Sequence, residues 1–149
     1  MVDKADNLMH STFAAEVQLP FRYTVIHGED PSRRSPQYKA VTRSLHLNGL
    51  IFETQKMEVE GFHLSFTGGT FGRNFLEIAL DLGKRSNTVE VLGQVEWYER
   101  RSTIIGHAFL VGVSFVDVAV EALSALRNYL QQTQSLMRQG SPRRRGVQE

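Results

Sequence analysis

Cysteine is absent from this sequence of 149 residues, and several classes of site are absent with it. A disulfide framework, a thiolate metal site and a cysteine nucleophile are all excluded. Long apolar runs are missing too, because no stretch approaches the ~20 residues that span a bilayer. The first residues have neither the basic start nor the apolar stretch of a signal peptide. We therefore expect a cytoplasmic protein without a membrane span.

Charge of one sign is also scarce, since the net charge is only +1. Residues 134–149 hold four arginines and one acid, so they contribute +3 and leave −2 for residues 1–133. This slightly acidic body argues against a dedicated nucleic-acid-binding domain, which normally carries a broad basic face. The run Arg143–Arg145 either contacts an acidic partner or serves as a solubilising end.

Catalytic patterns are missing as well. The sequence shows no nucleophile matched to a base and no pair of carboxylates placed for acid–base chemistry. The histidines are scattered without the helical spacing or the neighbouring cysteines of a metal site: His10, His27, His46, His63 and His107. The sequence therefore predicts no enzyme, no metal site and no cofactor.

What the sequence does contain is a series of short strand signals. Alternating or β-branched segments between polar turns predict strands over residues 17–26, 38–47, 50–54, 62–66, 76–82, 88–98 and 105–115. The pair Asn48-Gly49 predicts the turn of a hairpin, because both residues tolerate positive φ angles. After Asp117 the apolar residues recur at helical spacing, which predicts a helix to about Leu136.

This order of elements predicts a mainly β fold, a small antiparallel β-barrel with one helix packed on it. We expect a flexible segment over residues 1–16, the barrel and helix over residues 17–136, and a basic disordered tail over residues 137–149. The helix has more apolar positions than one stripe against a small barrel requires, so it is also a candidate surface for a protein partner or a homodimer. These positions are Val118, Val120, Leu123, Leu126, Tyr129, Leu130 and Leu136.

The strand, turn and strand of residues 43–54 resemble the most recognisable segment of PilZ domains. Two later segments also resemble that family, Val95-Glu96-Trp97 and Gly112-Val113-Ser114-Phe115-Val116-Asp117. The resemblance covers roughly residues 17–130, and it implies a six-stranded antiparallel barrel with a C-terminal helix. It also implies a bacterial signalling domain whose ligand is cyclic di-GMP.

The ligand-binding motifs of the resemblance are incomplete in this chain. The family has Asp or Asn, any residue, Ser, any two residues and Gly; aligned on Gly49, this chain has Ser44 and His46 at the first two fixed positions. PilZ receptors also supply an Arg-x-x-x-Arg motif before the first strand, whereas residues 11–16 contain no arginine and end in Glu16. Arginine suits this ligand because its planar fork binds phosphate or a guanine edge. The turn is kept, but the side chains that grip the ligand are not.

Eight residues are candidates for a cyclic di-GMP site: Arg33, Arg34, Arg43, Ser44, His46, Asn48, Gly49 and Trp97. Each has an alternative interpretation. The arginines are equally interpreted as solvated charges, and His46 as an outward-facing residue between inward Leu45 and Leu47. The indole of Trp97 either stacks on a base or anchors the core or rim of the barrel.

We therefore expect a PilZ-like signalling or adaptor domain that acts through protein contacts and binds nucleotide weakly or not at all. Two alternatives stay open. One is a direct cyclic di-GMP receptor with an atypical site, and the other is a small-molecule-binding β-barrel.

Overall fold

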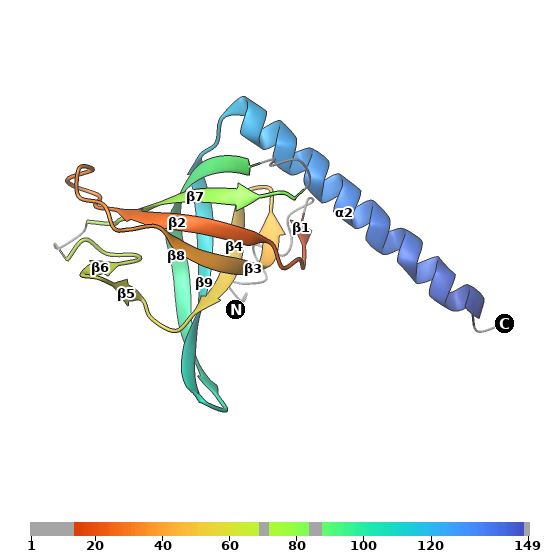
Figure 1. The fold of residues 1–149 in the computed structure, drawn as a ribbon, viewed down its shortest axis with the longest axis horizontal. Coiled ribbons are helices and arrows are strands. Elements are labelled where there is room, and N and C mark those ends of the chain that lie inside the picture. The colour runs from red at the N-terminus through yellow and green to blue at the C-terminus, as the bar shows by residue number, and fades with distance from the viewer. Residues whose placement is uncertain (1–13, 69–71, 84–87, 148–149) are drawn as a thin grey trace, which may run out of the picture.

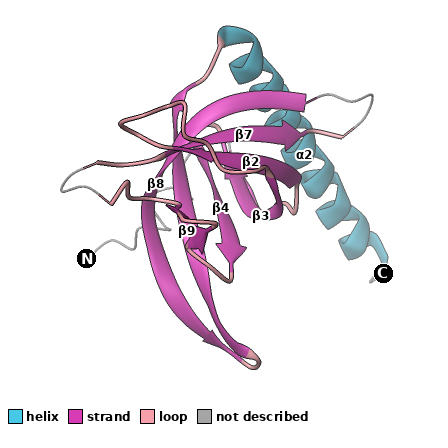
Figure 2. Cartoon of the chain, turned by 60° about the vertical axis from the view of Figure 1, so that its left-hand side comes forward, coloured by secondary structure: helices cyan, strands magenta, loops and turns pink. Residues whose placement is uncertain are grey.

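The computed structural model describes residues 14–68, 72–83 and 88–147, from residue 137 onward as backbone only. Six strands form a barrel and one long helix follows them (Figure 1, Figure 2). The barrel strands are β2 (Pro20–Ile26), β3 (Tyr38–His46), β4 (Gly49–Thr54), β7 (Phe75–Asp81), β8 (Thr88–Thr103) and β9 (Gly106–Asp117). The expected mainly β fold, a six-stranded barrel with a C-terminal helix, is confirmed.

Every pairing in the barrel is antiparallel. The strands follow the order β3-β2-β7-β8-β9-β4, and the pairing of β3 with β4 closes the barrel. Closure pairs the strands on both sides within the barrel itself, although β8 and β9 continue past their outer neighbours. Strand β1 (Ala14–Ala15) pairs beside the end of β3, and β5 (Glu58–Val59) forms a separate small hairpin with β6 (Phe62–His63).

Apolar side chains fill the barrel interior. Along β7 the burial alternates as period two requires, with Leu76, Ile78 and Leu80 all inaccessible to solvent. The ring of Phe52 packs edge-to-face on Phe21, with ring centroids 5.3 Å apart. The barrel interior is therefore a packed core and holds no space for a ligand.

Helix α2 (Val120–Val147) packs on the barrel through Leu126 and Leu130, which are both fully buried, and then runs beyond it (Figure 1). The expected end near Leu136 is wrong, because the backbone is helical to Val147. At the other end of the chain, β1 lies within the segment that we expected to be flexible.

The hairpin turn lies one residue earlier than predicted. Because His46 pairs with Gly49, the two turn residues are Leu47 and Asn48, and neither Asn48 nor Gly49 has a positive φ angle. This register places Leu45 opposite Leu50, and both side chains enter the core. Burial of that pair sets the register, since a slip of one residue would turn both leucines outward.

The strand expected over residues 62–66 is limited to the two residues of β6. His63 Nδ1 accepts hydrogen bonds from the backbone N–H groups of Ser65 (3.0 Å) and Phe66 (3.2 Å). These two bonds bend the backbone into a turn, so Phe66 makes only a single bridge, to Arg73. Hydrogen bonds to the His63 side chain therefore take the place of the strand pairing that was expected after residue 63.

Candidate functional site

A second apolar cluster lies outside the main core. It consists of Ile51 on β4, Trp97 on β8 and Leu110 on β9, all less than a tenth exposed. Leu50 and Val111, which adjoin Ile51 and Leu110, belong to the main core, so period two places Ile51 and Leu110 on the outer side of the barrel. Trp97 lies on the same side because it pairs with Gly112, the next residue after the core residue Val111. Ser44 is paired with Ile51 across β3 and β4, which extends this buried outer face to the motif residues. We call Ser44, His46, Ile51, Trp97 and Leu110 the outer-face cluster.

Trp97 is seated directly on Gly112. The two residues are paired after a β-bulge between Val95 and Trp97, and a Cβ added at Gly112 would lie 2.2 Å from Trp97 Cε2. Position 112 must therefore be glycine for the indole to lie against the sheet. Trp97 is 3% exposed, and its Nε1–H has no hydrogen-bond partner within the described residues.

Ser44 and His46 are both buried, and Ser44 Oγ lies 3.1 Å from His46 Nε2. The expectation that His46 faces solvent is wrong, since its exposure is 0%. Its side chain does lie on the opposite face from Leu45, as the alternation requires, but that face carries the outer-face cluster and not water. Alternation of a strand gives the face on which a residue lies but not what covers that face.

The other motif residues lie close by. The Arg43 guanidinium forms an ion pair with Glu53 across β3 and β4, at 3.0 Å. Asn48 is exposed at the turn, and its carbonyl accepts a hydrogen bond from the N–H of Phe115 (2.9 Å). The structure thus brings Arg43, Ser44, His46, Asn48, Gly49 and Trp97 onto the neighbouring strands β3, β4, β9 and β8.

Arg33 and Arg34 do not join this group. They lie in the loop before β3, while Ser44 lies near its end, so the length of strand between them is at least ~20 Å. Arg34 forms an ion pair with Glu77 of β7. Arg33 borders a pocket of about 270 Å³ together with His27, Phe62, His63 and Asn74.

Asn74 and His63 build this loop pocket. The Asn74 amide is 1% exposed; its Oδ1 accepts from the N–H of Gly28 (3.0 Å), and its Nδ2 donates to the carbonyls of His63 (2.7 Å) and Phe66 (3.0 Å). Burial lowers the pKa of His63, although the charge of Glu58 opposes the shift. The lowered pKa keeps this ring neutral, as its two accepted hydrogen bonds require.

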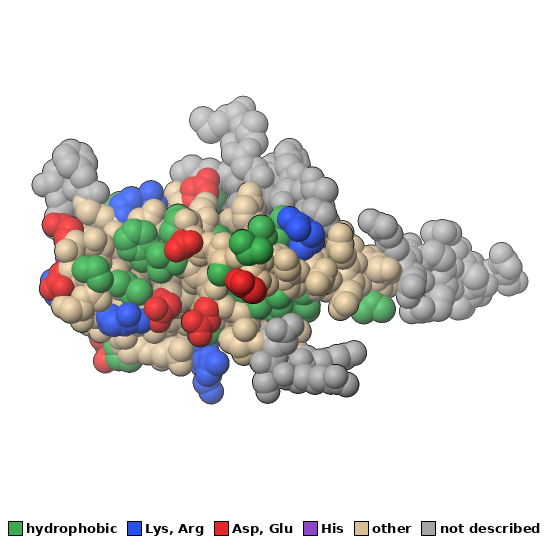
Figure 3. Space-filling view, turned by 90° about the horizontal axis from the view of Figure 1, so that it is seen from above, with side chains coloured by type: hydrophobic (Ala, Val, Ile, Leu, Met, Phe, Trp, Pro, Cys, Tyr) green, Lys and Arg blue, Asp and Glu red, His purple; other side chains and the backbone are tan. Residues whose placement is uncertain are grey.

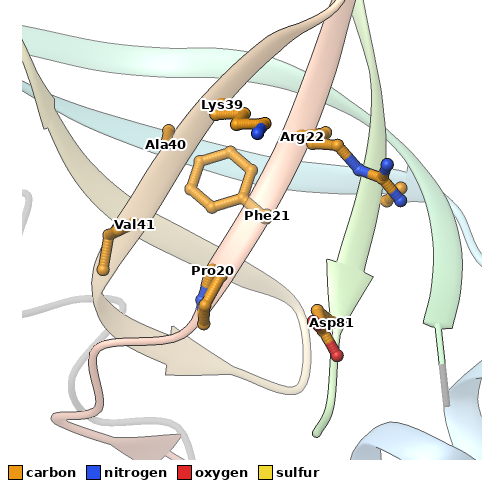
Figure 4. A pocket seen from close by; sticks show the side chains of 8 residues that line it. Pro20, Phe21, Arg22, Lys39, Ala40, Val41 and Asp81 are labelled. Carbon is orange, nitrogen blue, oxygen red and sulfur yellow. The ribbon is translucent and has the colours of Figure 1, made fainter. Parts of the chain in front are cut away.

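A groove of about 440 Å³ carries a pair of cations that sequence reasoning missed (Figure 4). Arg22 and Lys39 are direct cross-strand neighbours of β2 and β3, and neither makes an ion pair with a described residue. Asp81 also lines the groove. Two like charges placed opposite one another repel, so a bound anion would relieve them. The pairing register that joins them was not visible in the sequence.

Other classes of site find no support among the described residues. They include no group of three His, Cys, Asp or Glu side chains that could hold a metal ion. Within the same residues, no helix combines the length and apolarity needed to cross a membrane. Figure 3 shows acidic and basic side chains interspersed over one face of the barrel, without a broad basic patch.

Comparison with known proteins gives a result for structure but not for sequence. No protein-family model matches the chain, and no curated protein sequence matches it. Among solved structures, the PilZ domain with c-di-GMP of YcgR from Escherichia coli matches with a TM-score of 0.55 and 11% identity, over 83% of this chain and 88% of that one. The fold of this chain is that of a PilZ domain.

Two longer proteins contain the same fold. The Bacillus subtilis inhibitor of motility (MotI/DgrA) has a TM-score of 0.57 and 10% identity, over 82% of this chain and 49% of that one. The Borreliella burgdorferi PlzA protein in complex with c-di-GMP has a TM-score of 0.51 and 12% identity, over 83% of this chain and 52% of that one. The chain spans about half the length of each.

Proposed function

We propose that this chain is a non-enzymatic, cytoplasmic signalling or adaptor domain of the PilZ type, which acts in bacterial cyclic di-GMP regulation through protein contacts. In this proposal it binds the nucleotide weakly or not at all. The structural neighbours support the setting, since the YcgR and PlzA structures contain c-di-GMP and the Bacillus protein is an inhibitor of motility.

The observation that carries the proposal is the burial of the motif positions. Ser44 is 4% exposed and His46 is 0% exposed, so the groups at the family's ligand-gripping positions do not face solvent. They hydrogen-bond one another instead. A nucleotide would have to displace buried side chains before it could reach them.

Among the described residues, this face offers no unpaired arginine. The nearest one, Arg43, is paired with Glu53, and the stretch that corresponds to the family's arginine pair ends in the exposed Glu16. Loss of two charge-assisted phosphate contacts, each ~1.5–3 kcal/mol, weakens binding by about a hundredfold or more. Together with the buried motif, this predicts binding far weaker than that of a competent receptor.

The candidate contact surface is helix α2. Its second half extends beyond the barrel (Figure 1), and Leu136 on it is 67% exposed. A pocket of about 570 Å³ lies along the helix; its lining mixes apolar residues, such as Leu82 and Leu136, with polar ones, such as Asn128 and Gln132. A groove of mixed character beside an exposed leucine suits a protein partner or a second copy of the chain. Leu130, in contrast, belongs to the core.

The second candidate function is a direct cyclic di-GMP receptor with an atypical site. The groove with Arg22 and Lys39 favours it, because two uncompensated cations lie on adjacent strands beside an open surface. The loop pocket at Arg33 has a smaller volume than most pockets that bind a ligand of nucleotide size. A third possibility, a ligand inside the barrel, is disfavoured by the packed interior.

Calorimetric titration with cyclic di-GMP separates these functions. We expect no saturable low-micromolar heat from the native chain. Such a heat would contradict the adaptor proposal, and two double variants would then locate the site. Loss of binding in Arg22→Gln/Lys39→Gln but not in Arg33→Gln/Arg34→Gln would assign it to the groove, and the reverse result would assign it to the loop pocket.

A further inference from the structure

The β8–β9 hairpin extends far beyond the barrel as an arm (Figure 1, Figure 2). Pairing of β7 with β8 stops at Gly93, and pairing of β4 with β9 stops at Phe109. Residues 101–108 therefore form a two-stranded ribbon with no neighbouring strand on either side. We call residues 100–109 the hairpin arm. A two-stranded ribbon of this kind contributes little to the stability of the rest of the fold.

Two isoleucines occupy the tip of the hairpin arm. Ile104 and Ile105 form the two-residue turn between Thr103 and Gly106, and they are 103% and 88% exposed. Neither isoleucine has a positive φ angle, so the turn places no backbone strain on them. Neither side chain is covered by a described residue, so packing within the fold does not account for two large apolar side chains at this tip.

The arm also carries charge of one sign. Residues 100–109 contain two arginines and no acid, in a chain whose first 133 residues carry −2 overall. Arg100 makes no ion pair with a described residue, and Arg101 has only a long contact of 3.4 Å to Glu99. A basic collar thus lies directly behind the apolar tip.

Aromatic rings continue the same arm toward the barrel. His107 contacts Phe109 with centroids 5.9 Å apart, and Phe109 contacts Tyr98 at 6.2 Å. Tyr98 in turn contacts His63 at 5.8 Å. The histidine and tyrosine rings have an apolar body and a polar tip, which is the character of side chains at a membrane–water interface.

We propose that the hairpin arm docks on the surface of an anionic phospholipid bilayer. Ile104 and Ile105 enter the acyl boundary, Arg100 and Arg101 contact lipid phosphates, and the exposed ring of His107 lies at the headgroup level. A convex tip of two residues needs no preformed socket, which favours a deformable lipid surface over a folded protein. Two apolar side chains and two cations give weak, reversible binding. This inference does not depend on whether the chain binds cyclic di-GMP.

Vesicle sedimentation of the full chain tests the proposal. We expect binding to vesicles of phosphatidylcholine and phosphatidylglycerol mixed at about 2:1, and little binding to phosphatidylcholine alone. Ile104→Ser/Ile105→Ser should reduce the vesicle affinity at least ~tenfold. Arg100→Gln/Arg101→Gln should reduce it up to ~fivefold for each arginine and weaken its salt dependence.

Matched control variants change residues that lie outside the hairpin arm. Val120→Ser removes an exposed apolar side chain (76% exposed) outside the arm, and Lys56→Gln/Arg127→Gln removes two exposed cations outside it. Both should bind vesicles as the native chain does. If the mixed vesicles sediment none of the chain at low salt, the proposal is overturned. It is equally overturned if the isoleucine variant binds as well as Val120→Ser.

Because the chain has no cysteine, a single introduced cysteine can be labelled at a chosen position, and the label reports on the docking site independently of sedimentation. An environment-sensitive fluorophore on Ser102→Cys, within the arm, should shift to the blue when mixed vesicles are added. The same label on Ser124→Cys, exposed on α2, should not shift. A shift at position 124 alone would place the contact on the helix and overturn the proposal. An arm that responds only to an acidic protein, and never to lipid, would also overturn it.

Discussion

The side chain of His63 shows how one residue can hold a loop through a single ring nitrogen. Its Nδ1 accepts two backbone hydrogen bonds, so protonation of that atom would break both. The pKa of His63 is lowered from 6.5 by burial, which means that the unfolded chain takes up this proton at a higher pH than the folded chain does. The stability that His63 contributes is therefore complete above pH 6.5 and is lost as the pH falls below it.

We predict that the free energy of unfolding decreases as the pH falls from above 6.5 through the lowered pKa of His63. In His63→Gln this part of the pH dependence should disappear, since glutamine cannot take up the proton. Urea unfolding at a series of pH values measures the difference, with His107→Gln on the exposed arm as the control. Parallel pH profiles for native chain and His63→Gln would show that the ring is not the titrating group.

Single residues were also where sequence reasoning failed most clearly. The alternation of β3 correctly placed His46 on the opposite face from Leu45. It could not show that Trp97 and Leu110 are buried on that same outer face. Lys39 was missed because its meeting with Arg22 depends on the register between two strands. Contacts across strands are set by the whole sheet, so no local pattern contains them.

At the scale of elements, helix α2 divides into a packed half and a free half. Leu126 is fully buried among the core residues, whereas Leu136, ten positions later, is 67% exposed. Leu126→Ala should therefore lower the free energy of unfolding by about 2–5 kcal/mol, and Leu136→Ala by less than about 0.5 kcal/mol. Denaturant unfolding of the two variants measures this. Equal losses would mean that the distal half is also packed on the barrel.

Strand positions were largely predictable, while strand ends were not. Six barrel strands follow from apolar alternation, since each buries one face in a common core. The end of the predicted strand at residues 62–66 was wrong because the hydrogen bonds of His63 compete with the ladder. The end of α2 was wrong because the apolar pattern stops at Leu136, whereas the backbone is helical to Val147.

At the scale of the whole molecule, the closed and packed barrel leaves its outer surface for the binding of a ligand or partner. The interior is packed, so the candidate binding surfaces are the outer-face cluster, the groove at Arg22, the loop pocket at Arg33, helix α2 and the hairpin arm. The fold could be predicted because the order of strands, turns and helix is a property of the entire chain. The state of the candidate site could not, because it depends on whether distant strands cover the motif residues or leave them open.

The fluorescence of Trp97 tests the central claim most directly, because it is the only tryptophan in the chain and lies in the outer-face cluster. At 3% exposure its emission should be that of a buried indole, weakly quenched by acrylamide. We predict that saturating cyclic di-GMP changes neither the emission nor the quenching, since this face is already closed. A solvent-exposed emission, or a change that saturates at low-micromolar cyclic di-GMP, would contradict the account.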